Sequence, residues 1–363
     1  MHVIFLGLIH VTDSIHIWLS NRLEKQILAA GYTERDTEVQ IPEYDWKNGN
    51  PEDFYNTFIK RPHPVVLKGF MKDTALLKEL NWTSVLRKFG EEDVFLTKKE
   101  LDGYAGKLKE VDNPQVYLHN SEKLFSKYPE IVDYFQYERL EPFMKMKVGY
   151  EQMFVGRAGT GSPFHHASVY NMFYMIDGRK QWWFVDPSDT YLGYPAVLFG
   201  RAAGFLMCLW PGDYNKEAFP LFKYCPVYTT VLESGDILFN PPWWWHSIKN
   251  LSPTSVGVAS RWHTDGIVGD KLVATEEVHP YTQLYTPIHT IHTIHPYTHL
   301  YTPIYPYTHL YTLYTLYTLY TLYTLCRTIT STRSDPCSSS SESGHGSSFM
   351  AYCRLPPPST MST

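Results

Sequence analysis

Two histidines and a lysine carry the main chemistry that this sequence offers. His165 lies in a strand-like segment, His246 follows three consecutive tryptophans, and Lys180 lies in an apolar run. Imidazole nitrogens are common metal ligands, and a buried ammonium group is costly unless it meets an anion. If the three side chains converge, they form a pocket for a metal ion and an anion.

The dipeptide Asp-Gly at 177–178 is the main evidence on whether these side chains converge. It lies between apolar segments 171–176 and 179–185, which predicts a β-hairpin with a two-residue turn. Pairing outward from this turn sets Met175 opposite Lys180, on one face. If the first strand continues back without a bulge, alternation adds four more residues to that face. These residues are Phe173, Asn171, Ala167 and His165.

Two simpler explanations stay open. An outward-facing, solvated Lys180 explains the hairpin equally well. A lone His246 beside large aromatic residues is most often a satisfied core histidine. The pairing of His246 with a separate strand bearing His165, Asn171 and an inward Lys180 favours a pocket. Because alternation cannot bury three neighbouring tryptophans, we expect at least one of Trp243–Trp245 at the surface.

The stretch from Gly156 to Trp262 resembles the JmjC and cupin-like family of Fe(II)/2-oxoglutarate oxygenases, in particular the protein hydroxylases of the factor-inhibiting-HIF type. In that family, a Thr/Ser-Pro-x-His-x-Asp segment supplies two iron ligands, and Ser162–Ala167 occupies its place here. The last ligand follows a Pro-Pro-x-Trp-Trp-His signature, which matches Pro241–His246. The similarity covers about residues 41–265 and implies a double-stranded β-helix.

The resemblance also implies roles for single residues. His165 and His246 are the expected metal ligands, and Lys180 is expected to pair with the distal carboxylate of 2-oxoglutarate. Ser162 is expected to contact the same co-substrate or to serve only as a turn residue before Pro163, and Asn171 is expected to bond either the co-substrate or a backbone group. The implied enzyme is a 2-oxoglutarate-dependent dioxygenase that uses Fe(II) and hydroxylates a protein or peptide side chain.

Ala167 departs from the family pattern because it stands where the metal-binding carboxylate is expected. A triad of two histidines and one carboxylate normally holds Fe(II) on one face. Three hypotheses remain. In the first, the site is an active oxygenase whose coordination is completed by water, a distant carboxylate or the substrate. In the second, the domain is a catalytically inactive binding or scaffold module. In the third, the vacancy admits a halide.

The expected fold is mainly β with flanking helices, a jelly-roll or cupin barrel preceded by a helical part. We expect a short strand and turn at 64–70, helical spacing at 76–89 that ends at Gly90, another strand at 94–96 and a helix at 121–135. From Tyr150 onward, short strands alternate with turns.

Changes in composition predict three parts. Residues 1–40 form an N-terminal segment, and residues 41–270 form the JmjC/cupin-like domain. Residues 271–363 form a tail in which Tyr-Thr-Leu repeats from 311 to 325. A period of three fits neither a strand nor a helix, so we expect a disordered, low-complexity tail.

Composition excludes several classes of function. A net charge of −5 and a pI near 6.3 offer no broad basic surface, so we expect no nucleic-acid binding. The apolar run at 3–19 lacks a preceding basic residue and contains His10, Asp13 and His16, which argues against a signal peptide or membrane anchor. Five scattered cysteines favour an intracellular, reducing compartment. The sequence predicts no particular oligomeric state.

Overall fold

The computed structural model describes residues 21–263, except 36, 99–100, 122, 199–203, 208–213, 215 and 217–218. The first 20 residues and the predicted tail at 271–363 lie outside the described residues. The chain divides into two compact units. The described residues of the first are 21–32, which are helical from 21 to 29. The described residues from 33 to 263 belong to the second. None of the described helices has the length and hydropathy of a bilayer-spanning segment.

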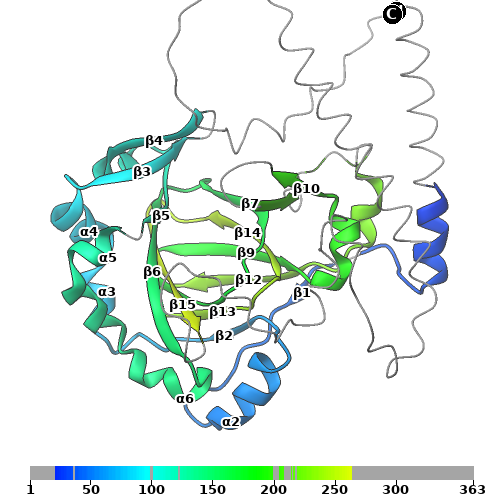
Figure 1. The fold of residues 1–363 in the computed structure, drawn as a ribbon, viewed down its shortest axis with the longest axis horizontal. Coiled ribbons are helices and arrows are strands. Elements are labelled where there is room, and N and C mark those ends of the chain that lie inside the picture. The colour runs from blue at the N-terminus through cyan, green and yellow to red at the C-terminus, as the bar shows by residue number, and fades with distance from the viewer. Residues whose placement is uncertain are drawn as a thin grey trace, which may run out of the picture. The chain divides into compact units, whose positions relative to one another are not determined.

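Two large sheets make up the second unit (Figure 1). The described strands of the first sheet follow the order β1-β12-β9-β14-β7-β11-β10. Their bounds are Val39–Gln40 (β1), Tyr228–Glu233 (β12), Arg179–Val185 (β9), Trp245–Asn250 (β14), Gly161–His165 (β7), Gly204–Met207 (β11) and Pro195–Leu198 (β10). The described strands of the second follow the order β2-β13-β8-β15-β6-β5-β3-β4. Their bounds are Val65–Leu67 (β2), Ile237–Asn240 (β13), Tyr170–Asp177 (β8), Ser255–His263 (β15), Lys147–Gly156 (β6), Val116–Ser121 (β5), Asp93–Lys98 (β3) and Leu101–Lys107 (β4).

Short helices cover the outside of the second sheet, as Figure 1 shows for α3, α4 and α5. The α-helices are Pro51–Phe54 (α2), Leu76–Glu79 (α3), Trp82–Phe89 (α4), Lys123–Lys127 (α5) and Glu141–Met144 (α6). A π-helical turn spans Tyr55–Ile59. Further 3₁₀ turns span Leu108–Asp112, Pro129–Phe135, Tyr137–Arg139, Pro187–Gly193 and Pro220–Tyr224. The predicted mainly β, cupin-type fold with flanking helices is confirmed.

Strand β8 shows how both faces of the second sheet are used. Phe173 and Met175 join a cluster that includes Trp182 and Phe184 of β9, so they lie in the interior between the sheets. Tyr174 joins the cluster that the helices form outside. A strand buried on both faces needs an unbroken apolar run, which explains why this segment has no polar alternation.

The predicted hairpin is wrong. Strand β8 pairs with β13 and β15, whereas β9 pairs with β12 and β14, so the two strands belong to different sheets. Gly178 adopts a φ of +83° at the corner, where a Cβ would lie 2.1 Å from the carbonyl oxygen of Thr254. The Asp177 carboxylate accepts a hydrogen bond from the Trp82 backbone N–H instead of closing a turn. Lys180 and Met175 nevertheless point into the same interior, as predicted, because the chain turns a corner between the two sheets and both sheets face that interior.

The predicted helix at 76–89 is interrupted. It forms two helices, α3 and α4, and Asn81 lies between them. Asn81 caps α4, because its side-chain oxygen accepts a hydrogen bond from the Ser84 backbone N–H at 2.9 Å. The predicted helix at 121–135 is also shorter: β5 ends at Ser121, and Pro129 opens a 3₁₀ turn after α5. The expected end at Gly90 and the strands at 65–67 and 93–98 agree with the prediction.

Asp236 ties the start of β13 to the segment after β2. It is buried, and its carboxylate accepts hydrogen bonds from Lys68 Nζ at 2.8 Å and from the backbone N–H groups of Gly69 and Glu233, each at 2.9 Å. Since β13 reaches the candidate site at its far end, this carboxylate anchors a strand that the site depends on.

We expect Asp236→Ala to lower the free energy of unfolding by about 2–4 kcal/mol, because it leaves buried donors and the Lys68 ammonium unmatched. Glu233→Ala is the control, because its exposed pair with Arg179 has a separation of 3.7 Å and is worth less than about 1 kcal/mol. Urea denaturation measures both values. Equal losses in the two variants would contradict the anchoring role.

Candidate metal and co-substrate site

His165 and His246 meet inside the barrel. They are directly paired between β7 and β14, and their ring centroids lie 4.3 Å apart. The Nδ1 of His165 lies 2.8 Å from the Pro163 carbonyl oxygen, and that of His246 lies 2.9 Å from the Trp244 carbonyl oxygen. A carbonyl only accepts, so each Nδ1 carries the proton and each Nε2 keeps a lone pair.

Burial lowers the pKa of both imidazoles, most strongly that of His246. The rings are therefore neutral at neutral pH. Neutral imidazoles with Nδ1–H bonded to a carbonyl are in the state that metal ligation requires. The arrangement thus fits a metal ion held by the two Nε2 atoms.

A β-bulge brings Ser162 to the same side as His165. The register shifts between the pairs His246–His165 and Ile248–Ser162, so two residues of β7 oppose one of β14. Ile248 faces the interior, and the bulge turns Ser162 with it. The Ser162 Oγ is buried and has no hydrogen-bond partner among the described residues. It is available to a guest molecule in the interior.

Ala167 lies just after β7 and is fixed through its main chain. Its carbonyl oxygen accepts a hydrogen bond from the Trp243 backbone N–H at 2.7 Å. Trp243 is half-buried, whereas Trp244 and Trp245 are buried, in keeping with the expectation that the three cannot all be inside. Within the described part of the chain, no group of three His, Cys, Asp or Glu residues is placed to hold a metal ion. No carboxylate in that part of the chain therefore completes a cluster in place of Ala167.

His166 points away from this pair. Its ring packs on Trp245 at 4.5 Å and on Trp243 at 5.6 Å. Ser260, whose direction the sequence left open, bonds through its hydroxyl to the Met172 carbonyl and accepts from the Trp262 indole. Trp262 belongs to the outer cluster, so Ser260 faces away from the interior.

Lys180 is fully buried in an aromatic cage at another part of the interior. Its Nζ lies 5.1 Å from the ring centroid of Phe173, 5.6 Å from that of Tyr117 and 6.0 Å from that of Phe154. It donates to the Tyr117 hydroxyl at 3.4 Å. Burial lowers the pKa of Lys180 to about 7 and raises that of Tyr117. A cation here has aromatic faces and one neutral hydroxyl around it, which leaves its charge uncompensated.

Aromatic contacts connect Lys180 to the histidines. Phe173 lies 5.1 Å from Lys180 Nζ and 4.9 Å from the Trp182 ring, and Trp182 stacks on His246 at 5.9 Å. The structure therefore brings His165, His246 and Lys180 into one interior cluster. Asn171 is also buried there, on the same face of β8 as Phe173, and its Oδ1 has no hydrogen-bond partner among the described residues.

The sequence reasoning missed several polar residues of this interior. Asn250 is directly paired with Lys180 across β14 and β9, and it donates to the Thr160 hydroxyl at 2.9 Å. A Cβ at Gly156 would lie within 3.4 Å of Tyr117, Thr160 and Asn250, so glycine keeps this end open. No local sequence motif identifies these residues. They are recognised only in the structure, by their positions near Lys180.

Arg261 and Asn240 are missed residues at the histidine end. The guanidinium of Arg261 donates to Gln152 Oε1 at 2.9 and 2.7 Å, and its charge helps to lower the pKa of both His165 and His246. Asn240 ends β13, and its Nδ2 lies 3.2 Å from His246 Nε2.

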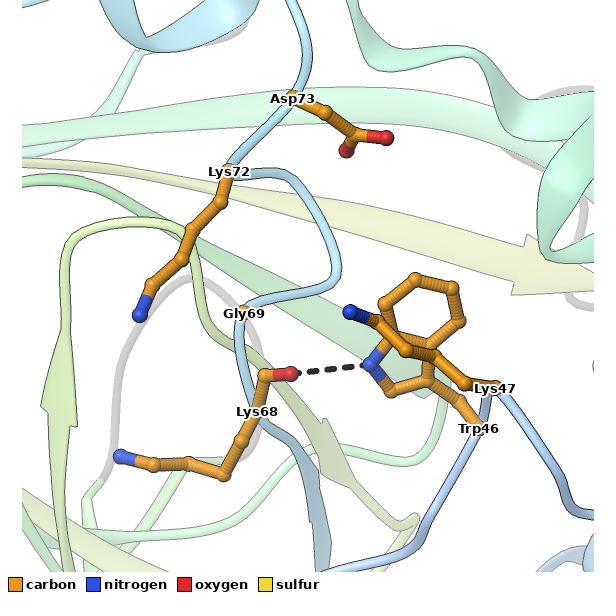
Figure 2. A pocket seen from close by; sticks show the side chains of 6 residues that line it. All are labelled: Trp46, Lys47, Lys68, Gly69, Lys72 and Asp73. Carbon is orange, nitrogen blue, oxygen red and sulfur yellow. Dashed lines mark hydrogen bonds between the residues drawn. The ribbon is translucent and has the colours of Figure 1, made fainter.

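A separate pocket of about 280 Å³ lies elsewhere (Figure 2). Its lining residues are Trp46, Lys47, Lys68, Gly69, Lys72 and Asp73. The Trp46 indole donates to the Lys68 carbonyl there at 2.9 Å, and the Lys68 ammonium reaches Asp236 at the start of β13. None of the predicted ligand residues lines this pocket.

Replacing Lys180 tests its burial through pH. Since its folded-state pKa of about 7 lies below the ordinary value of 10.5, the unfolded chain binds more protons between these pH values. Wild-type stability therefore rises with pH in this window relative to Lys180→Met. We expect the methionine variant to be the more stable protein near pH 7, with its advantage shrinking by about 1 kcal/mol per pH unit from pH 7.5 to 9.5. Denaturation at several pH values measures this. A constant difference would show that the ammonium group is solvated or paired.

Comparison with known proteins agrees with this architecture. Residues 96–266 match the family described as the cupin-like domain. JmjC domain-containing protein D of Dictyostelium discoideum is 25% identical over 239 residues, covering 55% of this chain and 52% of its own. Human HSPB1-associated protein 1 is 21% identical over 221 residues, covering 60% and 45%. Arginine-specific demethylase JMJ20 of Arabidopsis thaliana is 26% identical over 116 residues, covering 31% and 24%.

The chain spans about half the length, or less, of these relatives. The matched residues include both histidine strands and the strand that carries Lys180. The chain thus carries a cupin-like domain of the JmjC type, a family of Fe(II)- and 2-oxoglutarate-dependent oxygenases.

Proposed function

We propose that this domain is a 2-oxoglutarate-dependent oxygenase that hydroxylates a protein side chain. The observation that supports this most directly is the pair of neutral imidazoles, 4.3 Å apart, in one aromatic interior with a buried lysine. The two Nε2 atoms are the expected ligands of Fe(II). The Lys180 ammonium is the expected partner of a carboxylate. One buried cation, Lys180, is enough to bind the distal carboxylate of a dicarboxylate such as 2-oxoglutarate.

Each residue has a task that follows from its surroundings. His165 and His246 would hold the metal, which when bound supplies the oxidising chemistry that breaks a C–H bond. Lys180, with the Tyr117 hydroxyl beside it, would orient 2-oxoglutarate by its distal carboxylate. The unmatched hydroxyl of Ser162 and amide oxygen of Asn171 would complete its hydrogen bonds. The aromatic walls exclude water, which strengthens all of these polar contacts.

A protein side chain is the proposed substrate. The relatives include a protein named as an arginine-specific demethylase and a protein named for its association with HSPB1, which is in keeping with a protein substrate or partner.

A second candidate is a binding module without catalysis. Two observations favour it: Asn240 donates to His246 Nε2, the nitrogen that a metal would need, and the lowered pKa leaves Lys180 partly uncharged at neutral pH. In this case the interior keeps the family's shape while binding neither metal nor co-substrate. The following two experiments separate the candidates.

We expect 2-oxoglutarate binding to take up protons above pH 7. A bound carboxylate restores the charge of Lys180, whose pKa in the empty cage is about 7, so at pH 8 close to one proton enters with each ligand. Calorimetric titration in the presence of Co(II), in two buffers with different ionisation enthalpies, measures this uptake. Lys180→Met should abolish both the uptake and most of the affinity. Binding without any proton uptake, or no binding at millimolar 2-oxoglutarate, would argue against the proposed role of Lys180.

We expect Ala167→Asp to raise Fe(II)-dependent turnover of 2-oxoglutarate by about tenfold or more, because a carboxylate at this position restores the usual third ligand. Ala167→Leu is the matched control, since it adds a side chain of similar length without a ligating oxygen. Succinate formation measures turnover. If neither variant gains activity and neither binds Fe(II) more tightly, the domain is better described as the binding module.

A further inference from the structure

Asn240 is an interior side chain that lies beside one of the two histidines. It is buried at the end of β13, on the same face as Leu238, which belongs to the interior cluster. Its side chain contacts His246, with 3.2 Å between Nδ2 and Nε2. The strand therefore ends with an amide next to the lone pair that a metal ion would use.

This contact is not the usual support of a metal-binding histidine. Such support normally reaches the ring nitrogen that does not bind the metal. In His246 that nitrogen is Nδ1, and the Trp244 carbonyl already accepts its proton at 2.9 Å. Asn240 instead meets Nε2, so a metal ion on Nε2 would displace the N–H donor of the amide.

Rotating the amide by half a turn resolves this conflict. The oxygen and nitrogen of an asparagine side chain have nearly the same shape, and their assignment follows from hydrogen bonding. Asn240 Oδ1 is buried and has no hydrogen-bond partner among the described residues, so the rotation breaks no bond at that oxygen. Afterwards, an acceptor oxygen lies where the N–H donor was.

The distance also fits ligation. Two ligands about 2.1 Å from one metal ion lie about 3.0 Å apart at a right angle and about 3.4 Å apart at the tetrahedral angle. The observed 3.2 Å between the amide and His246 Nε2 lies between these values.

We propose that the Oδ1 atom of Asn240 is the third protein ligand of the metal, supplied from β13 in place of the carboxylate absent at Ala167. This inference rests on the proposed function and adds a ligand to it. Within the described part of the chain, no third His, Cys, Asp or Glu is available, so the donor is a neutral oxygen. A site of three neutral donors leaves the full charge of the ion to be balanced by a bound anion.

The test uses Co(II) alone as the probe, followed by its visible absorption during titration of the whole chain. Asn240→Leu should weaken Co(II) binding by about tenfold or more, because it removes the oxygen at nearly constant volume. Asn240→Asp should strengthen binding by a similar factor, because it puts a charged oxygen at the same place. Gln181→Leu is the control: this amide on β9 is bonded to Thr229 at 2.6 Å, away from the histidines, and its loss should change affinity less than twofold.

The outcomes separate this inference from the proposed function. Wild-type binding that neither Asn240 variant changes would overturn the ligand role while leaving a metal site on the two histidines. Failure of the wild type and of Asn240→Asp to bind Co(II), with and without 2-oxoglutarate, would overturn both. Because Asn240→Leu removes a buried polar group, circular dichroism checks that this variant folds. Asn240→Asp then decides the question through its gain in affinity.

Discussion

A polar group inside an apolar barrel has to find its partner there, and this constraint governs the whole interior. The Nδ1–H groups of His165 and His246 are matched by backbone carbonyls, which leaves each Nε2 as an acceptor, and the two ring centroids lie 4.3 Å apart. Lys180 has rings and one hydroxyl around it, and its ammonium is left without a counter-charge. The interior therefore holds imidazole acceptors that suit a cation and an ammonium group that suits an anion.

Spacing along the strands predicted the candidate site better than it predicted strand pairing. His165, His246 and Lys180 do share one interior, and Met175 does face the same way as Lys180. The hairpin failed because an Asp-Gly corner serves equally well to change sheets, and because β8 and β9 each find two other partners. The expected continuous strand from His165 to Met175 is also wrong, because β7 ends at His165 in one sheet and β8 begins at Tyr170 in the other. The neighbours of a strand are chosen by the packing of the entire barrel.

The remainder of the site has no local signal. The inward turn of Ser162 depends on a bulge that strict alternation does not reveal. Tyr117 is 63 residues from Lys180 in sequence and becomes its neighbour only when the sheets close. Asn240 is only 6 residues before His246, but it ends a strand of the other sheet. Asn240 precedes two prolines, a pattern that predicts the end of a strand. Its position beside His246 depends on how the strands pair, which the sequence does not reveal.

The contact between Trp243 and Ala167 fixes the main chain just after β7. Trp243 has a φ of +68°, a conformation that costs a residue with a side chain about 1 kcal/mol or more, and its N–H is held by the carbonyl oxygen at 167. That bond involves only main-chain atoms. This hydrogen bond therefore holds the main chain at residue 167 in place without using its side chain.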